Sequence, residues 1–251
     1  MKAHAPSPAS TEETTPDLAV ILAGAGEGRR MGDLGPKLLL EVGGRPALAR
    51  VAETFLRHPA VAELIVVVPA ELEGQARRVV NALRDPRGVR VATIAGGATR
   101  QESVALGIEA LATNPAFIAV HDVARVLVDA ALIDRVLIAA RATGAAIPAL
   151  PLTDTVKETA PGGDTILRSV PRQRLVGAQT PQVFASAILR KAHARARKAG
   201  DLATDEAGLA EAIGAPVAIV VGAERNRKLT VPADVILLNA LLESEAAREL
   251  T

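Results

Sequence analysis

Apolar and polar residues follow two different patterns along the chain. Short runs such as Leu18–Leu22 and Leu64–Val68 are apolar at nearly every position, which is typical of strands buried on both faces. Longer segments carry apolar residues three and four positions apart, as in a helix that packs on one side. We expect strands at 18–22, 64–68, 89–94, 117–120, 145–150 and 216–221, and helices at 46–57, 72–83, 101–111, 130–140, 185–198, 205–212 and from about 232. This alternation predicts a doubly wound, mostly parallel α/β sheet.

The alternation is interrupted between residues 152 and 174. Two short β-like runs, 154–158 and 165–170, flank the turn sequence Ala160–Asp164. A hairpin cannot continue a parallel crossover, so we expect it to project as an arm. Residues 1–16 lack the apolar centre of a secretory signal, and we expect a disordered N-terminal extension. Residues 17–251 are expected to form a single domain that carries the arm.

Composition narrows the possible functions. The 251 residues include 29 Lys+Arg and 28 Asp+Glu, and this near-neutral balance argues against nucleic acid as the main partner. The absence of Cys excludes disulfides, thiolate catalysis and Cys-based zinc sites, and it fits a cytoplasmic location. No apolar run approaches the roughly 20 residues that cross a bilayer, so no membrane partner is expected.

A glycine-rich loop follows the first expected strand. It reads Ala23-Gly-Ala-Gly-Glu-Gly-Arg-Arg-Met-Gly32 and continues to Lys37. Backbone N–H groups of such a loop can cradle phosphate oxygens. The dinucleotide fingerprint fails because Arg29 stands where glycine is needed, and the P-loop fails because Leu38 follows the lysine. The cations of this loop favour a polyanion such as a triphosphate, and a solvated turn with incidental basic residues is the alternative.

The loop resembles that of nucleotidyltransferases that activate sugar or polyol phosphates, and most closely the 2-C-methyl-D-erythritol 4-phosphate cytidylyltransferase family. Further blocks resemble the same family in the same order: Gly96-Gly97…Ser103, Val120-His-Asp122…Arg125, Asp154-Thr-Val-Lys157, Gln179-Thr-Pro-Gln182, Thr204-Asp-Glu206 and Asn226-Arg-Lys-Leu-Thr230. These blocks cover nearly everything after residue 16. The resemblance implies a Rossmann-like nucleotidyltransferase fold. It also implies transfer of CMP from CTP to 2-C-methyl-D-erythritol 4-phosphate, with release of pyrophosphate, in isoprenoid precursor synthesis.

The resemblance also implies roles for single residues. The implied catalytic residues are Lys37, Lys228 and Arg30. Those implied to bind the nucleotide are Ala25, Gly26, Glu27, Gly28, Arg29, Gly96, Ser103 and Asp122. Those implied to bind the polyol phosphate are Arg125, Asp154, Thr155, Arg172, Thr180, Thr204 and Asp205. Asp122 is also the implied ligand of Mg²⁺, and the arm is implied to reach a second subunit of a homodimer.

Several interpretations stay open beside this one. A ribitol 5-phosphate cytidylyltransferase would share the loop and the arm, whereas a non-catalytic nucleotide-binding regulator would not need both Lys37 and Lys228. Thr204-Asp-Glu206 is also typical of a helix start, and Lys228 is expected where a strand meets the last helix. The chain departs from the family pattern at Leu38, where Gln is common, and at Val126, where Pro is usual.

Overall fold

The computed structural model describes residues 16–25, 35–85 and 87–249. Most of the described strands form one eight-stranded sheet in the order β10-β7-β11-β6-β1-β4-β5, with β12 also paired to β7. They are β1 (Leu18–Ala23), β4 (Val61–Val68), β5 (Arg90–Ala95), β6 (Phe117–Asp122), β7 (Ala145–Pro151), β10 (Val176–Ala178), β11 (Gln182–Ala185) and β12 (Ala218–Val221). The pairs β1–β4, β1–β6, β4–β5 and β7–β12 are parallel. The predicted doubly wound, mostly parallel sheet is confirmed.

Two antiparallel strands were not predicted. β11 lies between β6 and β7 and runs antiparallel to both, while β10 pairs with β7 in the same antiparallel sense. Two expectations near the strand ends are wrong in detail. β6 continues through Asp122 instead of ending before it, and Lys228 follows β12 by several residues in a segment without strand structure.

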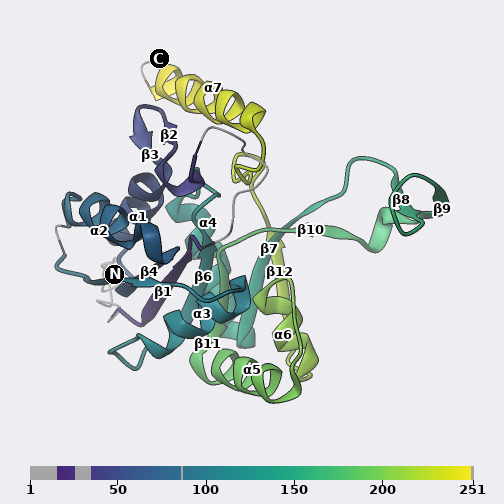
Figure 1. The fold of residues 1–251 in the computed structure, drawn as a ribbon, viewed down its shortest axis with the longest axis horizontal. Coiled ribbons are helices and arrows are strands. Elements are labelled where there is room, and N and C mark those ends of the chain that lie inside the picture. The colour runs from purple at the N-terminus through teal and green to yellow at the C-terminus, as the bar shows by residue number, and fades with distance from the viewer. Residues whose placement is uncertain (1–15, 26–34, 86, 250–251) are drawn as a thin grey trace, which may run out of the picture.

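Helices cover both faces of the sheet, as Figure 1 shows. The helices on one face are α1 (Ala47–Arg57), α2 (Glu73–Asn81) and α4 (Ala130–Thr143), and those on the other are α3 (Arg100–Glu109), α5 (Ser186–Ala199) and α6 (Glu206–Ala212). Successive side chains of a strand point to opposite faces, so Val20 packs with the first group and Ile21 with the second. Both faces are therefore buried, which explains why the strands are apolar throughout.

The last helix and a two-stranded hairpin form a small separate layer at one edge of the fold. Its elements are β2 (Glu41–Val42), β3 (Arg45–Pro46) and α7 (Pro232–Glu249), while the preceding turn η2 (Lys37–Leu39) packs its leucines in the same cluster as α1. Val42, Val126 and Leu238 are buried in one cluster there. Val126, which stands where the family usually has proline, is thus held by apolar packing. Neither α7 nor any other helix in the described part of the chain is long and apolar enough to span a membrane.

The predicted arm is present and projects from the sheet, at the right of Figure 1. It consists of β8 (Val156–Thr159) and β9 (Ile166–Val170), which pair only with each other among the described strands, followed by η4 (Arg172–Arg174). Ile166 and Leu167 on β9 are 59% and 60% exposed. An isolated two-stranded hairpin has little stability of its own in water, so this arm gains from a further surface to pack on.

Candidate active site

A cavity of about 240 Å³ opens where β6 ends, at the carboxyl edge of the parallel strands. This edge is where ligands of open α/β sheets bind. The residues that line it are Arg100, Asp122, Arg125, Ala178, Gln179, Thr180, Gln182, Thr204, Asp205 and Lys228. The structure thus brings together, from separate parts of the chain, the predicted residues Asp122, Arg125, Thr180, Thr204, Asp205 and Lys228.

Asp122 forms ion pairs with two cations of this cavity. Its Oδ1 lies 3.1 Å from the Arg100 guanidinium, and its Oδ2 accepts a hydrogen bond of 2.7 Å from Lys228 Nζ. Burial alone would raise the pKa of the Asp122 carboxyl, but Arg100 and Lys228 outweigh burial and hold that pKa well below its usual range. Asp122 is therefore a carboxylate at neutral pH, and its charge keeps the Lys228 ammonium at the cavity.

A buried hydrogen-bond chain fixes the backbone at Asp122. Burial lowers the pKa of His121 to about 4, so its ring is neutral near pH 7. Its Nε2 lies 3.1 Å from the Arg125 carbonyl oxygen, which can only accept, and this assigns the proton to Nε2. Nδ1 then accepts from the Thr180 hydroxyl at 3.0 Å, and Thr180 Oγ1 in turn accepts from the Asp122 N–H at 3.1 Å. His121 and Thr180 thus position Asp122.

Arg125 joins three segments of the chain at the cavity. Its guanidinium donates to the carbonyl oxygens of Asn226, at 2.9 Å, and Ala178, at 3.1 Å. Asn226 is fully buried and donates through Nδ2 to the carbonyl oxygen of Thr180 at 2.8 Å. Burial, together with the nearby Arg100 charge, lowers the pKa of Arg125. These contacts hold the segment that carries Lys228 against the end of β6.

A second cavity, of about 260 Å³, adjoins the first and shares Arg125, Gln179 and Lys228 with it. Residues 150–152 and 177, at the root of the arm, form one wall, and Arg227 contributes a further cation. Arg125, Arg227 and Lys228 outnumber Glu224, the acidic residue of this lining, so the cavity favours an anion such as a phosphate group. The polar centre therefore extends from β6 towards the arm.

Thr204 and Asp205 lie at the start of α6. Asp205 caps this helix, because its Oδ1 accepts from the Gly208 N–H at 3.0 Å, and its Oδ2 accepts from Gln182 Nε2 at 2.8 Å. The capping role that the sequence offered as an alternative is therefore present. Both residues still line the cavity, so the cap also sets the position of its wall.

The glycine-rich loop is described only at its two ends. Gly26, Glu27, Gly28, Arg29 and Arg30, all predicted site residues, lie outside the described residues. At the first end, Gly96 packs directly against Ala25 and Ser103. A Cβ added to Gly96 would lie 2.6 Å from the Ala25 Cβ and 2.7 Å from Ser103 Oγ. At the other end, Lys37 begins η2 and is half-buried. Ala25 and Gly96 are thus brought together beside the cavity edge of the sheet.

Ser103, which the family resemblance assigns to the nucleotide, makes its described contacts within the turn that begins α3, the alternative that the sequence also allowed. It is almost fully buried on α3, where its hydroxyl donates to the Thr99 carbonyl oxygen at 2.8 Å and accepts from the Gly97 N–H at 3.1 Å. The hydroxyl therefore shapes the turn before α3.

Asp154, Thr155 and Arg172 lie on the arm and are exposed. None of the three lines either cavity, and Figure 1 shows the arm extending away from the sheet that carries Asp122. Within one chain the structure does not bring them to the predicted residues that line these two cavities. Any contribution from them to this kind of site would have to come from a second copy.

The fit of Mg²⁺ can be judged from the donors at the cavity. The described residues contain no group of three or more His, Cys, Asp or Glu side chains that could hold a metal ion. The carboxylates among the described residues of the cavity are Asp122 and Asp205. Asp205 caps α6 and accepts from Gln182, whereas Asp122 is held by Arg100 and Lys228, so a metal ion at Asp122 would share that carboxylate with these two cations. One carboxylate suits Mg²⁺ when substrate phosphates and water supply the remaining ligands.

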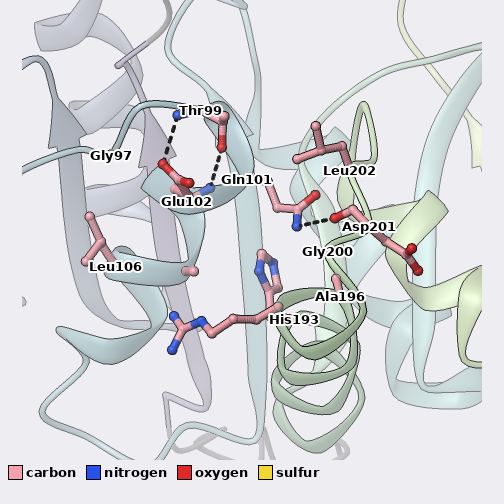
Figure 2. A pocket seen from close by; sticks show the side chains of 12 residues that line it. Gly97, Thr99, Gln101, Glu102, Leu106, His193, Ala196, Gly200, Asp201 and Leu202 are labelled. Carbon is pink, nitrogen blue, oxygen red and sulfur yellow. Dashed lines mark hydrogen bonds between the residues drawn. The ribbon is translucent and has the colours of Figure 1, made fainter.

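A larger cavity, of about 420 Å³, lies between α3 and α5 (Figure 2). It contains no predicted site residue. Gln101 donates across it to the Asp201 carbonyl oxygen at 3.0 Å, and Glu102 accepts from the Thr99 N–H in the helix cap. Burial and nearby arginine charges lower the pKa of His193 to about 4, so that ring is neutral. The charged side chains of this lining are Glu102, Arg197 and Asp201. Arg197 pairs with Glu109 and Asp201 with Arg195, and both ion pairs are exposed. None of the three is a buried charge held between two cations, as Asp122 is.

Two charged groups of the site were not assigned from the sequence. Arg100 donates to both oxygens of Glu206 at 2.9 Å while it holds Asp122. Glu206 is 1% exposed. An acidic residue in the first turn of a short helix is ordinarily a surface feature, and no local pattern places it opposite an arginine 106 positions away.

Comparison with known proteins identifies one family. Residues 18–244 match the family model described as 2-C-methyl-D-erythritol 4-phosphate cytidylyltransferase. The protein of that name from Thermus thermophilus is 43% identical over 225 residues, which cover 90% of this chain and 97% of the relative. Its namesake from Solibacter usitatus is 38% identical over 240 residues, which cover 92% and 98%. The crystal structure of the Thermus thermophilus enzyme superposes with a TM-score of 0.71, at 40% identity over 89% of this chain and 97% of that one.

Proposed function

Because the chain belongs to the 2-C-methyl-D-erythritol 4-phosphate cytidylyltransferase family, we propose that it transfers CMP from CTP to 2-C-methyl-D-erythritol 4-phosphate. The products are 4-diphosphocytidyl-2-C-methyl-D-erythritol and pyrophosphate, and the reaction serves isoprenoid precursor synthesis. The observation that carries the proposal is the cluster of Arg100, Asp122 and Lys228 at the carboxyl edge of the sheet, beside a second cavity rich in cations.

This reaction requires positive charge at the site and precise positioning of its two substrates. A phosphate oxygen of the acceptor attacks the α-phosphorus of CTP, a new P–O bond forms, and the bond to the β-phosphate breaks to release pyrophosphate. The attacking group is already an anion, so no strong general base is needed. Two polyanions must approach each other, and fixed cations lower the cost of that approach. Lys37 and Lys228 take this role in our proposal, with residues 26–30 at the triphosphate.

Asp122 is the proposed holder of Mg²⁺. When bound, the ion neutralises charge on the triphosphate oxygens. The chain's own contribution is to present the carboxylate from a backbone that His121 and Thr180 fix. Arg125 and Arg227 bind the acceptor phosphate in the adjoining cavity, where they and Lys228 supply the positive charge.

We also propose a homodimer in which each arm completes the partner's site. Asp154, Thr155 and Arg172 would bind the polyol phosphate there. The exposed apolar side chains of β9 and the lack of other strand partners for the arm among the described strands support this arrangement. We expect the reaction in the cytoplasm, where CTP is available.

The test of function is pyrophosphate release by the purified protein with CTP and Mg²⁺. We expect release with 2-C-methyl-D-erythritol 4-phosphate and much less with ribitol 5-phosphate, the acceptor of the alternative enzyme. Lack of release with the first acceptor would refute the proposal. A regulator without catalytic activity would bind CTP and release none with either acceptor.

The test of the arm is complementation between two inactive variants. Arg172→Ala and Lys228→Ala proteins are each expected to have low activity. If arms act across the dimer, a mixed dimer has one site with both defects and one site with neither, so mixing restores activity. If each arm served its own chain, both sites of a mixed dimer would stay defective.

A further inference from the structure

Glu206 is a buried carboxylate to which no step of the proposed reaction gives a role. It is 1% exposed and begins α6, directly after the helix cap Asp205. Burial raises the pKa of its carboxyl, and the neighbouring Arg100 charge opposes that rise. A buried acid of this kind is costly to keep, because desolvation offsets much of the attraction between the charges. Stability alone therefore does not account for this residue.

The Arg100 guanidinium links Glu206 to Asp122. Arg100 Nη1 donates to both Glu206 oxygens at 2.9 Å, while Nε donates to Asp122 Oδ1 at 3.1 Å. The guanidinium is planar and rigid, so fixing one edge fixes the other. Glu206 thereby determines where Arg100 meets Asp122. The Arg100 side chain also lines the cavity and is 27% exposed, so it is part of the site's wall as well as of the core.

The order of the charged side chains supports the same role for Glu206. Along the row Glu206, Arg100, Asp122 and Lys228, acidic and basic groups alternate at 2.7–3.1 Å. Without Glu206, the full charge of Arg100 would act on Asp122 alone. With Glu206 present, two carboxylates share that guanidinium, so Arg100 offsets less of the Asp122 charge and more of that charge acts on Lys228.

We infer that Glu206 is a positioning residue for nucleotidyl transfer: through Arg100 it sets the orientation and the effective charge of Asp122, and through Asp122 the place of Lys228. This inference rests on the proposed function, since it concerns the same reaction. It adds a residue on α6, remote in sequence from Asp122, to the machinery at the end of β6.

The experiment is a double-mutant cycle with Glu206→Gln and Arg100→Gln. Gln keeps the size of Glu and removes its charge. We expect kcat to fall roughly 10- to 100-fold in each single variant, while the KM for the acceptor changes less than about twofold. If Glu206 acts through Arg100, the double variant is no slower than Arg100→Gln alone. Multiplied losses in the double variant, or a normal kcat in Glu206→Gln, would overturn the inference.

Three controls separate this role from other effects. Glu109→Gln removes a carboxylate from a surface pair with Arg197 and should leave kcat unchanged. Arg100→Lys keeps the positive charge, so this variant should fold. A lysine ammonium cannot span both carboxylates, so kcat should still be reduced. This variant keeps the test available if Glu206→Gln does not fold. Normal kcat in Arg100→Lys would count against the inference. Wild-type protein that releases no pyrophosphate would refute the proposed function, a result distinct from either failure.

Discussion

Thr180→Val tests whether one buried hydroxyl holds Asp122 in place. The substitution leaves the side-chain shape nearly unchanged and removes the oxygen that accepts from the Asp122 N–H and donates to His121 Nδ1. Thr180 is 4% exposed, so water cannot easily replace the hydroxyl. Each buried polar group left without a partner costs about 1–3 kcal/mol, and two such groups are left here, so we expect a loss of about 2–6 kcal/mol in the free energy of unfolding. Thr180→Ser keeps the hydroxyl and loses one methyl group, at a cost of about 1 kcal/mol.

Urea unfolding at pH 7 measures both variants under identical conditions. We expect the unfolding midpoint of Thr180→Val to lie clearly below that of Thr180→Ser. Pyrophosphate release should also fall in the valine variant, because the Asp122 backbone loses its anchor, and should persist in the serine variant. Equal midpoints for the two variants would refute the hydrogen-bond chain on which this reasoning rests.

Three further outcomes are expected. Glu63→Gln should lower the free energy of unfolding at pH 7 by about 1–3 kcal/mol, because the N–H groups of Ala112 and Thr113 lose a charged acceptor. Burial works to raise the pKa of Glu63, but these donors outweigh burial and lower that pKa. In urea titrations the difference in free energy of unfolding between wild type and Glu63→Gln should therefore narrow as pH falls through the lowered pKa. Burial lowers the pKa of His121 to about 4, so the unfolded chain binds a proton first and wild-type stability should fall as pH drops from about 6.5 towards 4; a His121→Asn variant should show a shallower slope. Lys37→Ala should cost at least about 3 kcal/mol of transition-state stabilisation, roughly a hundredfold in kcat/KM, and normal turnover in steady-state assays would remove Lys37 from catalysis.

The sequence predicted those parts of the fold that depend on local patterns. Strands buried on both faces are recognisable as apolar runs, and the helices that cover them have a clear period, so β1, β4 and α1 lie close to their expected positions. β10 and β11 were missed because they are three and four residues long and lie on either side of Pro181. Short strands next to a proline carry too little pattern to be recognised.

Contacts between distant segments could not be predicted from local patterns. The segments that meet at Asp122 were found through their likeness to family motifs, which located residues such as Thr180 but not what each side chain touches. The sequence analysis assigned Thr180 to the substrate, whereas in the structure its hydroxyl binds His121 and the Asp122 N–H. Glu206 matched the first turn of a helix, and its partner Arg100 is visible only in three dimensions.

The missed strand β11 explains why the site forms where it does. In its antiparallel pairing with β6, Gln182 lies opposite Val120, and the same register carried two residues further places Thr180 opposite Asp122. A parallel neighbour would bring its own carboxyl end to this edge, whereas the antiparallel strand brings its beginning, together with the residues that precede it. Gln179, one residue earlier, accepts from the Ala223 N–H at 3.1 Å and so ties in the segment that leads to Lys228. The antiparallel strand β11 thus places the Thr180 hydroxyl that anchors Asp122 and the Gln179 contact that leads to Lys228. A shift in the register of β11 should therefore disable the site even if every charged residue were kept.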